Sequence, residues 1–163
     1  MPIHRPVTTL AATALTAVAV ALPATATAKP VAYEGRTSSG TVTFDRSGDT
    51  VSNLRGLVFV ACASTKTSDT KAGAELFDPP GTVAMGHEVE LEAEGDSAVA
   101  SHRVTKTYRM TLTPGRRGVV RGELHLTFML FEPMFDVFGT IDTNTFLCGG
   151  EAAFKAKPVA RKR

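Results

Sequence analysis

Residues 87–96 read HEVELEAEGD, and this stretch decides the fold class. Glutamates occupy alternate positions, while Val89, Leu91 and Ala93 stand between them. Because successive side chains of a β-strand point to opposite faces, the alternation predicts a strand with one acidic, solvated face and one apolar face. A helix would need an apolar period near 3.6 residues, and no stretch between residues 29 and 163 keeps that period for three turns.

The residues that follow predict two further antiparallel strands. A tight turn at residues 95–96 would place Glu88 opposite Arg103 on the solvated face. A second turn at residues 114–118, which read PGRRG, would begin a third strand that ends near Leu130. We therefore predict a three-stranded meander in this part of the chain.

The rest of the chain shows the same period-two pattern between turn residues. Strands are expected around residues 41–45, 50–62, 139–142 and 145–155. Seven or eight short antiparallel strands in one domain favour an all-β fold, either a β-sandwich or a jelly roll. A small closed β-barrel is the alternative.

The N-terminal residues have the order of a secretory signal peptide. Arg5 precedes an apolar run over residues 10–22, and small residues follow it up to the expected cleavage site. We predict a signal peptide over residues 1–28, a single β domain over residues 29–156 and a basic tail over residues 157–163. The protein would then be secreted, with no membrane span left after cleavage of the signal.

The charge balance bears on the class of partner. The chain has 18 Lys and Arg against 16 Asp and Glu, and a nucleic-acid-binding protein normally shows a stronger basic bias. Basic residues collect in KAKPVARKR, residues 155–163, as a solvated tail or as a contact to an anionic cell surface. We expect a cell-envelope, glycan or protein ligand rather than nucleic acid.

Cys62 and Cys148 are the two cysteines of the chain. An even pair in an exported protein predicts a disulfide. This bond would join the early and late parts of the domain, and the chain-entropy model gives a stabilisation on the order of 4 to 5 kcal/mol for so long a loop.

The acidic stretch is the first candidate for chemistry. Alternate Cα atoms of a strand are roughly 7 Å apart, so a straight strand cannot bring four carboxylates to one ion, as a calcium loop does. Two neighbouring carboxyls would satisfy the spacing of a glycosidase pair, but the chain has no tryptophan for sugar stacking. We interpret the glutamates as a solvated strand face, with a weak cation site or a surface for a basic partner as the alternative.

His87 and His102 become diagonal neighbours on the inward face in the predicted register. A separation of roughly 7 Å would let a metal ion bridge them, although two histidines beside small residues are more often hydrogen-bonded in a core. His125 falls on the opposite face. The chain has no CxxC, HExxH or GxSxG motif, so we expect no metal, no cofactor and no catalytic residue.

Residues 128–139 read FMLFEPMFDVFG and hold more large apolar side chains than one strand face can bury. Phe131, Met134, Phe135 and Phe138 are therefore candidates for contact with a ligand. The alternative is a crossover segment that fills the core between sheets.

Two segments carry a resemblance to known proteins. YEGRTSSGTVTFDRSGDTVSNL and CGGEAAFKAK resemble the two ends of small secreted proteins of high-GC Gram-positive bacteria. The matching positions are Gly35, Thr37, Ser38, Gly40, Val42, Phe44, Cys62, Cys148 and Gly150. Those proteins often have a tryptophan in the last strand, where this chain has Phe154. The group has no assigned activity, so the resemblance implies a β-sandwich and not a function.

These observations favour a secreted, non-catalytic binding or structural module at or outside the cell envelope. A carrier of a small apolar ligand and an extracellular hydrolase are the alternatives. A pocket lined by phenylalanines would favour the carrier, and histidines that converge with an acid in a cleft would favour the hydrolase.

Overall fold

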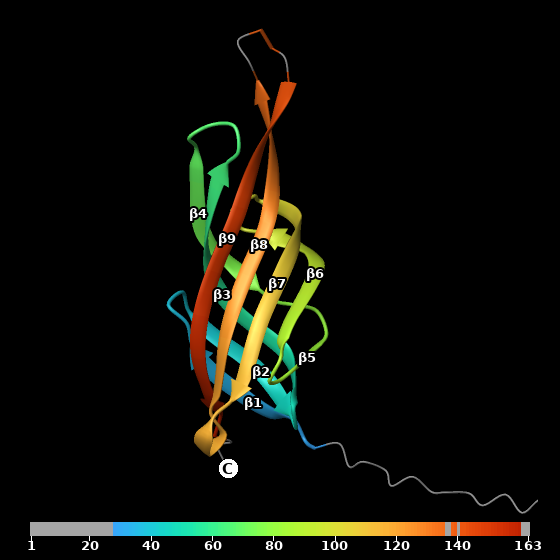
Figure 1. Cartoon of the computed structure of the whole chain (residues 1–163), viewed down its shortest axis with the longest axis vertical. Helices are drawn as coiled ribbons and strands as arrows, with labels where there is room; N and C mark the ends of the chain where they lie inside the picture. The colour runs from blue at the N-terminus through green and yellow to red at the C-terminus, as the bar shows by residue number, and fades with distance from the viewer. Residues whose placement is uncertain (1–27, 136–137, 140, 161–163) are drawn as a thin grey trace, which may run out of the picture.

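The computed structural model describes residues 28–135, 138–139 and 141–160, and these residues form an all-β fold (Figure 1). The strands are β1 (Val31–Arg36), β2 (Thr41–Ser47), β3 (Thr50–Ser64), β4 (Thr70–Phe77), β5 (Thr82–Ala84), β6 (Glu88–Ser97), β7 (His102–Pro114), β8 (Val120–Phe135) and β9 (Ile141–Pro158). A short 3-10 helix, η1 (Arg116–Gly118), lies between β7 and β8. The predicted all-β antiparallel class is confirmed, with nine strands where seven or eight were expected. The predicted signal peptide lies outside the described residues, apart from Ala28.

All nine strands belong to one hydrogen-bonded sheet, in the order β4-β3-β2-β1-β9-β8-β7-β6, with β5 paired to β3. The long strand β3 has two partners on the same side. Its first part, residues 50–55, pairs with β2, and its last part, residues 61–64, pairs with β9. The β1–β2 hairpin therefore lies between β3 and β9 at one end of the molecule only.

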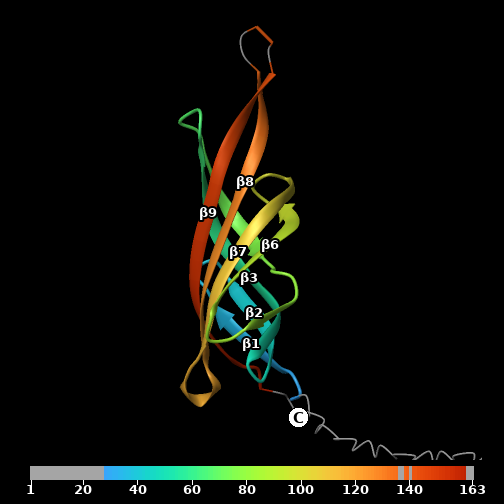
Figure 2. The same ribbon diagram turned by 45° about the vertical axis from the view of Figure 1, so that its right-hand side comes forward.

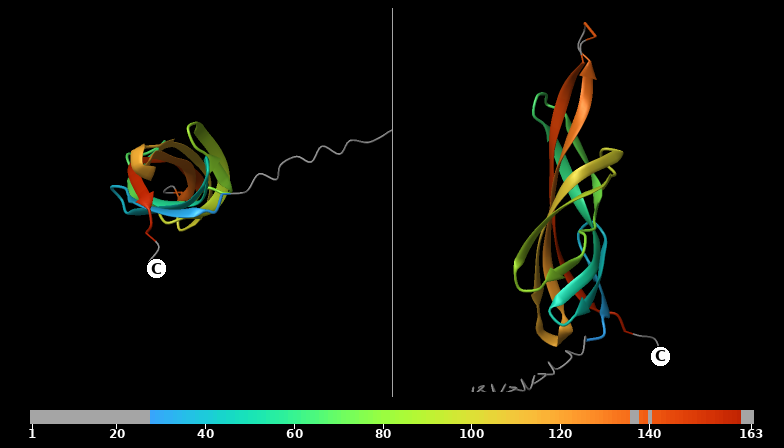
Figure 3. Two further views of the ribbon diagram at one scale, coloured as in Figure 1. Left: turned by 90° about the horizontal axis from the view of Figure 1, so that it is seen from below. Right: turned by 90° about the vertical axis from the view of Figure 1, so that its right-hand side faces the viewer.

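The sheet curls so that its inner face surrounds a single core, as the view along the long axis shows (Figure 3). Val58 and Val60 of β3 and Leu124 and Leu126 of β8 all belong to this core, and all four are fully buried. Among the described residues no backbone ladder joins the two ends of the strand order, β4 and β6. The sheet is therefore not a closed barrel, and its two opposed layers belong to one curved sheet.

Strands β8 and β9 are the longest and form a hairpin that projects beyond the other strands (Figures 1 and 2). The opposite end of the molecule holds the β7–β8 turn, the start of β1 and the end of β9 (Figure 2). The pairing of β1 with β9 continues at this end to Pro158, so Lys157 belongs to strand β9.

The predicted disulfide is confirmed. Cys62 of β3 and Cys148 of β9 are directly opposite each other in the ladder, with Cα atoms 4.0 Å apart. Both residues are buried, so the bond fastens the early strand to the last strand inside the core.

The predicted turn at residues 95–96 is wrong, because β6 continues to Ser97 and the turn spans residues 98–101. The Ser97 hydroxyl accepts a hydrogen bond from Ala100 N at 3.0 Å, and the Ser97 carbonyl accepts one from Ser101 N at 2.8 Å. These bonds close the turn over residues 98–101, whereas Gly95 and Asp96 lie within strand β6. Glu88 consequently pairs with Thr111 and not with Arg103.

Candidate functional site

The four alternate glutamates of β6 are exposed, which confirms the predicted solvated face. The predicted contact between Glu88 and Arg103 is wrong. Arg109 is the neighbour of Glu88 at 3.4 Å and of Glu90 at 2.8 Å, whereas Arg103 lies 3.7 Å from Glu94. The carboxylates therefore spread along the strand, and their charges are partly balanced by arginines of β7.

The predicted pairing of His87 with His102 is also wrong. His87 precedes β6 and His102 begins β7, so the observed register puts them at opposite ends of the β6–β7 hairpin. Both are exposed, and His102 Nδ1 lies 2.9 Å from the Ala100 carbonyl oxygen. His125 lies on the outer face, as predicted, where its Nδ1 is 3.7 Å from a Glu151 carboxylate oxygen. No group of three or more His, Cys, Asp or Glu side chains in the described part of the chain could hold a metal ion.

The candidate phenylalanines lie on the projecting β8–β9 hairpin. Phe131 is 57%, Phe135 67% and Phe138 89% exposed, and Met134 is half-buried. A groove of about 680 Å³ on the outside of β7, β8 and β9 is lined by Phe131 but not by the other three. These side chains project outwards and do not together line an interior cavity of the kind that a carrier needs.

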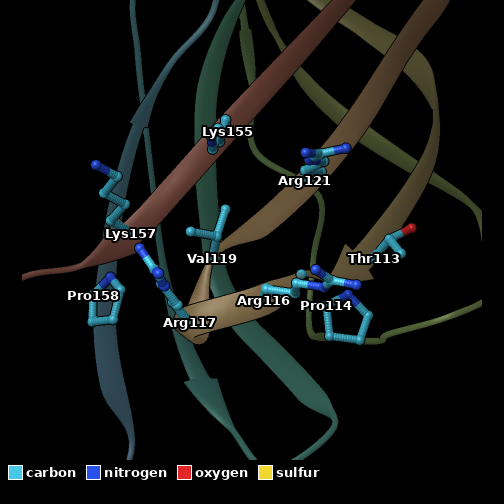
Figure 4. Close-up of a pocket in the computed structure, with 10 residues that line it drawn as sticks. Thr113, Pro114, Arg116, Arg117, Val119, Arg121, Lys155, Lys157 and Pro158 are labelled. Carbon is cyan, nitrogen blue, oxygen red and sulfur yellow. The ribbon is translucent and has the colours of Figure 1, made fainter.

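A group of cationic side chains lies at the opposite end of the molecule, around a hollow of about 820 Å³ beside the β7–β8 turn (Figure 4). Five of the side chains that line it are cationic: Arg116, Arg117, Arg121, Lys155 and Lys157. Together with Arg36, which lies in the next hollow beside Lys155, they form what we call the basic cluster.

Strand alternation positions the central members of this cluster. On β9, Ala156 is buried while Lys155 and Lys157 are exposed. Lys155 is directly opposite Arg36 on β1 and directly opposite Arg121 on β8, so three cations form a row across three adjacent strands. Like charges in directly opposite positions destabilise a sheet, so the row is unfavourable in the absence of an anion.

The β7–β8 turn places two more cations beside this row. Gly115 N donates a hydrogen bond to the Val119 carbonyl at 2.7 Å, which closes the loop around η1. Arg117 has φ 57° and ψ 36°, in the left-handed region that few residues other than glycine adopt. Its side chain extends towards the end of β9, where Lys157 lies (Figure 4). Strained backbone of this kind is concentrated at functional sites.

Two carboxylates lie near the basic cluster, Glu34 on β1 and Glu123, which is two residues from Arg121 on the same face of β8. Glu34 is opposite Lys157 on β1 and is the carboxylate that shares the hollow beside Arg36. Within the described residues, none of the six cations forms an ion pair. The sequence continues with Arg161, Lys162 and Arg163, which lie outside the described residues. The exposed guanidinium groups and ammonium groups can bind phosphate or carboxylate groups through charge-assisted hydrogen bonds.

A second charged group is buried and was missed in the sequence. Glu75 of β4 and Lys106 of β7 have side chains that are 1% and 2% exposed, and Lys106 Nζ donates to Glu75 Oε2 at 3.0 Å. The other carboxylate oxygen accepts hydrogen bonds from Ser97 Oγ at 2.6 Å and from Val99 N at 2.8 Å. Lys106 Nζ also donates to the Asp96 carbonyl at 2.6 Å. This network links β4 to β6 and β7 where no backbone ladder does.

The network also sets the protonation of Glu75. Burial disfavours the carboxylate and is the largest single influence, but the hydrogen bonds from Ser97, Val99 and Lys106 together outweigh it and lower the pKa of Glu75 below 4.5. Glu75 is therefore ionised at neutral pH. Because the pair is enclosed by the sheet, it supports the fold and not a reaction with a dissolved substrate.

No family model matches the chain, and comparisons with curated proteins and with solved structures likewise give no match. Among the described residues, no helix has the length and apolar character needed to cross a membrane.

Proposed function

We propose that the protein is a secreted, non-catalytic module that binds an anionic polymer of the cell envelope through the basic cluster. The observation that carries this proposal is the row formed by Arg36, Lys155 and Arg121, in which like charges occupy directly opposite positions without an ion-pair partner among the described residues.

The spacing of the row suits a polymer with repeated charges. Adjacent strands lie about 4.8 Å apart, so the three cations recur at about that interval across the sheet. Arg116 and Arg117 add two guanidinium groups on the side of the turn, and a guanidinium can bind a phosphate or a carboxylate with two parallel hydrogen bonds. A chain of phosphodiester or uronate units would place several anions along this surface at once.

The buried disulfide supports a location outside the cell. Disulfides form and persist in oxidising compartments and are rare in the cytosol. The pattern of the N-terminal residues favours export for an independent reason, since it has the order of a signal peptide.

A binding assay with two polyanions tests the proposal. Polyphosphate and polygalacturonate serve as phosphate and carboxylate probes, and binding is measured by titration calorimetry at low and at physiological salt. The double variant Arg121→Gln/Lys155→Gln should bind about 10- to 30-fold more weakly, because two exposed charges together contribute up to about 2 kcal/mol.

The matched control is Arg103→Gln/Arg109→Gln, which removes two exposed cations of β7 that already face glutamates of β6. This variant should retain the affinity of the unmodified protein. Equal losses in both variants, or no binding to either polymer at low salt, would show that the basic cluster is not the binding site.

A further inference from the structure

One large area of the outer face of the sheet carries no charged side chain. This area is centred on β3 and β9. Outward positions in residues 57–63 of β3, 70–76 of β4, 127–131 of β8 and 145–149 of β9 are all apolar or small, apart from threonines. We call this surface the apolar face. It lies beyond the β1–β2 hairpin, away from the basic cluster.

The ladder shows that the apolar face is continuous across four strands. Ala61 of β3 is opposite Ala72 of β4 and opposite Gly149 of β9, and Gly149 is opposite Thr127 of β8. One row further along, Leu147 is opposite Ala63 on one side and opposite Met129 on the other.

Large side chains stand on this face with most of their surface in water. Phe59 and Phe131 are each 57% exposed, Leu147 is 56%, Met129 is 52% and Leu76 is 46% exposed. Single exposed apolar residues are ordinary, but a contiguous set of this size marks a surface that contacts another apolar surface.

The apolar face is not flat. Ala61, Ala72 and Gly149 form a shallow centre with no long side chain, and Phe59 and Leu147 stand on either side of it. A second copy related by a two-fold axis could seat its protruding side chains over this centre, as an interface between identical patches requires.

Pairs of polar and charged side chains surround the apolar face. They are Arg55–Asp78 at 3.2 Å, His125–Glu151 at 3.7 Å, Lys66–Asp142 at 2.7 Å and Arg103–Glu94 at 3.7 Å. An apolar centre inside a polar rim is the anatomy of a protein–protein interface. Because the three pairs that contain an arginine or a lysine hold both signs, the rim offers little net charge to a strongly charged partner.

We infer that the apolar face is the contact between two copies of this chain in a two-fold dimer. The face has no charge to complement, so its partner must itself be neutral and apolar, and the chain presents such a surface. The four strands span about 19 Å, and residues 57–63 span about 23 Å. The resulting projected area is about 450 Å², somewhat over half of the roughly 800 Å² per partner of a standard interface, and the protruding side chains add to it.

This dimer goes beyond the proposed function and does not rest on it. The basic cluster lies at the other end of the sheet and stays open in each copy. Two basic clusters on one particle would bind one polymer chain with avidity, because the second contact becomes intramolecular.

Sedimentation velocity over a wide concentration range tests the dimer directly. We expect the unmodified protein to sediment with twice the monomer mass. Leu147→Glu should weaken the dimer roughly 100-fold, because each copy buries one unpaired charge and each costs about a factor of ten or more. Met129→Glu gives an independent variant on the neighbouring strand, and circular dichroism verifies that both variants remain folded.

Val31→Glu and Val159→Glu are the matched controls, since both valines are exposed apolar residues outside the apolar face. They should leave the dimer unchanged. A monomer at every concentration would overturn the inference, and so would a dimer that tolerates both Leu147→Glu and Met129→Glu. Binding of a monomer to neutral phosphatidylcholine vesicles that is lost in Leu147→Glu would overturn it as well, because a lipid surface would then be the partner.

Discussion

Replacing Lys106 with methionine removes one half of the buried ion pair while keeping the length of the side chain. Glu75 would then hold a negative charge that only Ser97 and Val99 stabilise, in a site that is almost fully closed to water. Loss of one partner from a buried pair costs about 3 to 5 kcal/mol. The free energy of unfolding of a domain of this size is about 5 to 15 kcal/mol, so Lys106→Met should remove a large share of it.

The double variant Lys106→Met/Glu75→Gln separates the pair from its surroundings. Glutamine keeps a carbonyl oxygen for the hydrogen bonds from Ser97 and Val99 but carries no charge. Each single variant leaves one unpaired charge, whereas the double variant leaves none. We expect the double variant to lose less than the sum of the two singles, with a coupling free energy of at least about 2 kcal/mol.

Urea denaturation followed by far-ultraviolet circular dichroism measures these free energies, since the chain has no tryptophan to report by fluorescence. Arg109→Met is the control on the same strand, because Arg109 makes exposed ion pairs that contribute at most about 1 kcal/mol. A cost below about 1 kcal/mol for Lys106→Met, or additive single variants, would refute the buried pair.

The buried pair also leads to a prediction of how the stability of the fold depends on pH in acid. The pKa of Glu75 is lowered in the folded state, so its charge stabilises the fold fully above about pH 4.5. This contribution is lost as the pH falls from about 4.5 through the lower pKa of the folded state. The stability of Glu75→Gln should therefore change less than that of the unmodified protein over this acidic range.

Two further predictions concern the contact between β3 and β9. A Cβ added at Gly150 would lie 2.2 Å from the Phe59 carbonyl oxygen, so Gly150→Ala should destabilise the domain by about 1 to 3 kcal/mol, whereas Gly149→Ala meets only an ordinary contact at 3.7 Å and should change it by less than about 0.5 kcal/mol. Thermal unfolding of the two variants compares them, and equal values would contradict the close approach of the strands. Cys62→Ser/Cys148→Ser should lower the free energy of unfolding in urea by about 4 kcal/mol. A reducing agent should destabilise the unmodified protein but not this variant, and an unmodified protein that is insensitive to reduction would count against the disulfide.

The strand faces could be predicted from the sequence because they depend only on local alternation. Val89, Leu91 and Ala93 face inward, as HEVELEAEGD indicates, and the glutamates between them face water. The faces of these residues stayed correct although the predicted turn was wrong, because the observed register differs from the predicted one by an even number of residues. His87 and His102, which were predicted to face inward, are exposed at the ends of the hairpin.

The register itself could not be predicted, because a distant strand decides it. The turn that begins at Ser97 is held by Glu75 of β4, which accepts hydrogen bonds from Ser97 Oγ and Val99 N. A local comparison of turn residues favours Gly95-Asp96 and contains no information about that carboxylate. One signal was present nevertheless: Lys106 alternates in phase with the buried Val104 and Tyr108, and an inward lysine requires an acid in the core.

The basic cluster combines residues from three separated segments, so the sequence reveals only the part of it near the C-terminus. The repulsion between its cations can be calculated for the row centred on Lys155. Two unit charges about 5 Å apart in water repel each other by about 0.8 kcal/mol, and Lys155 has two such neighbours, Arg36 and Arg121. Salt screens part of this repulsion but not all of it, since the spacing is shorter than the screening length of about 8 Å. An anion placed between two of these cations adds two attractions, each at about half that distance and therefore about twice as large, so together they outweigh the repulsion between the cations when the protein binds a polyanion.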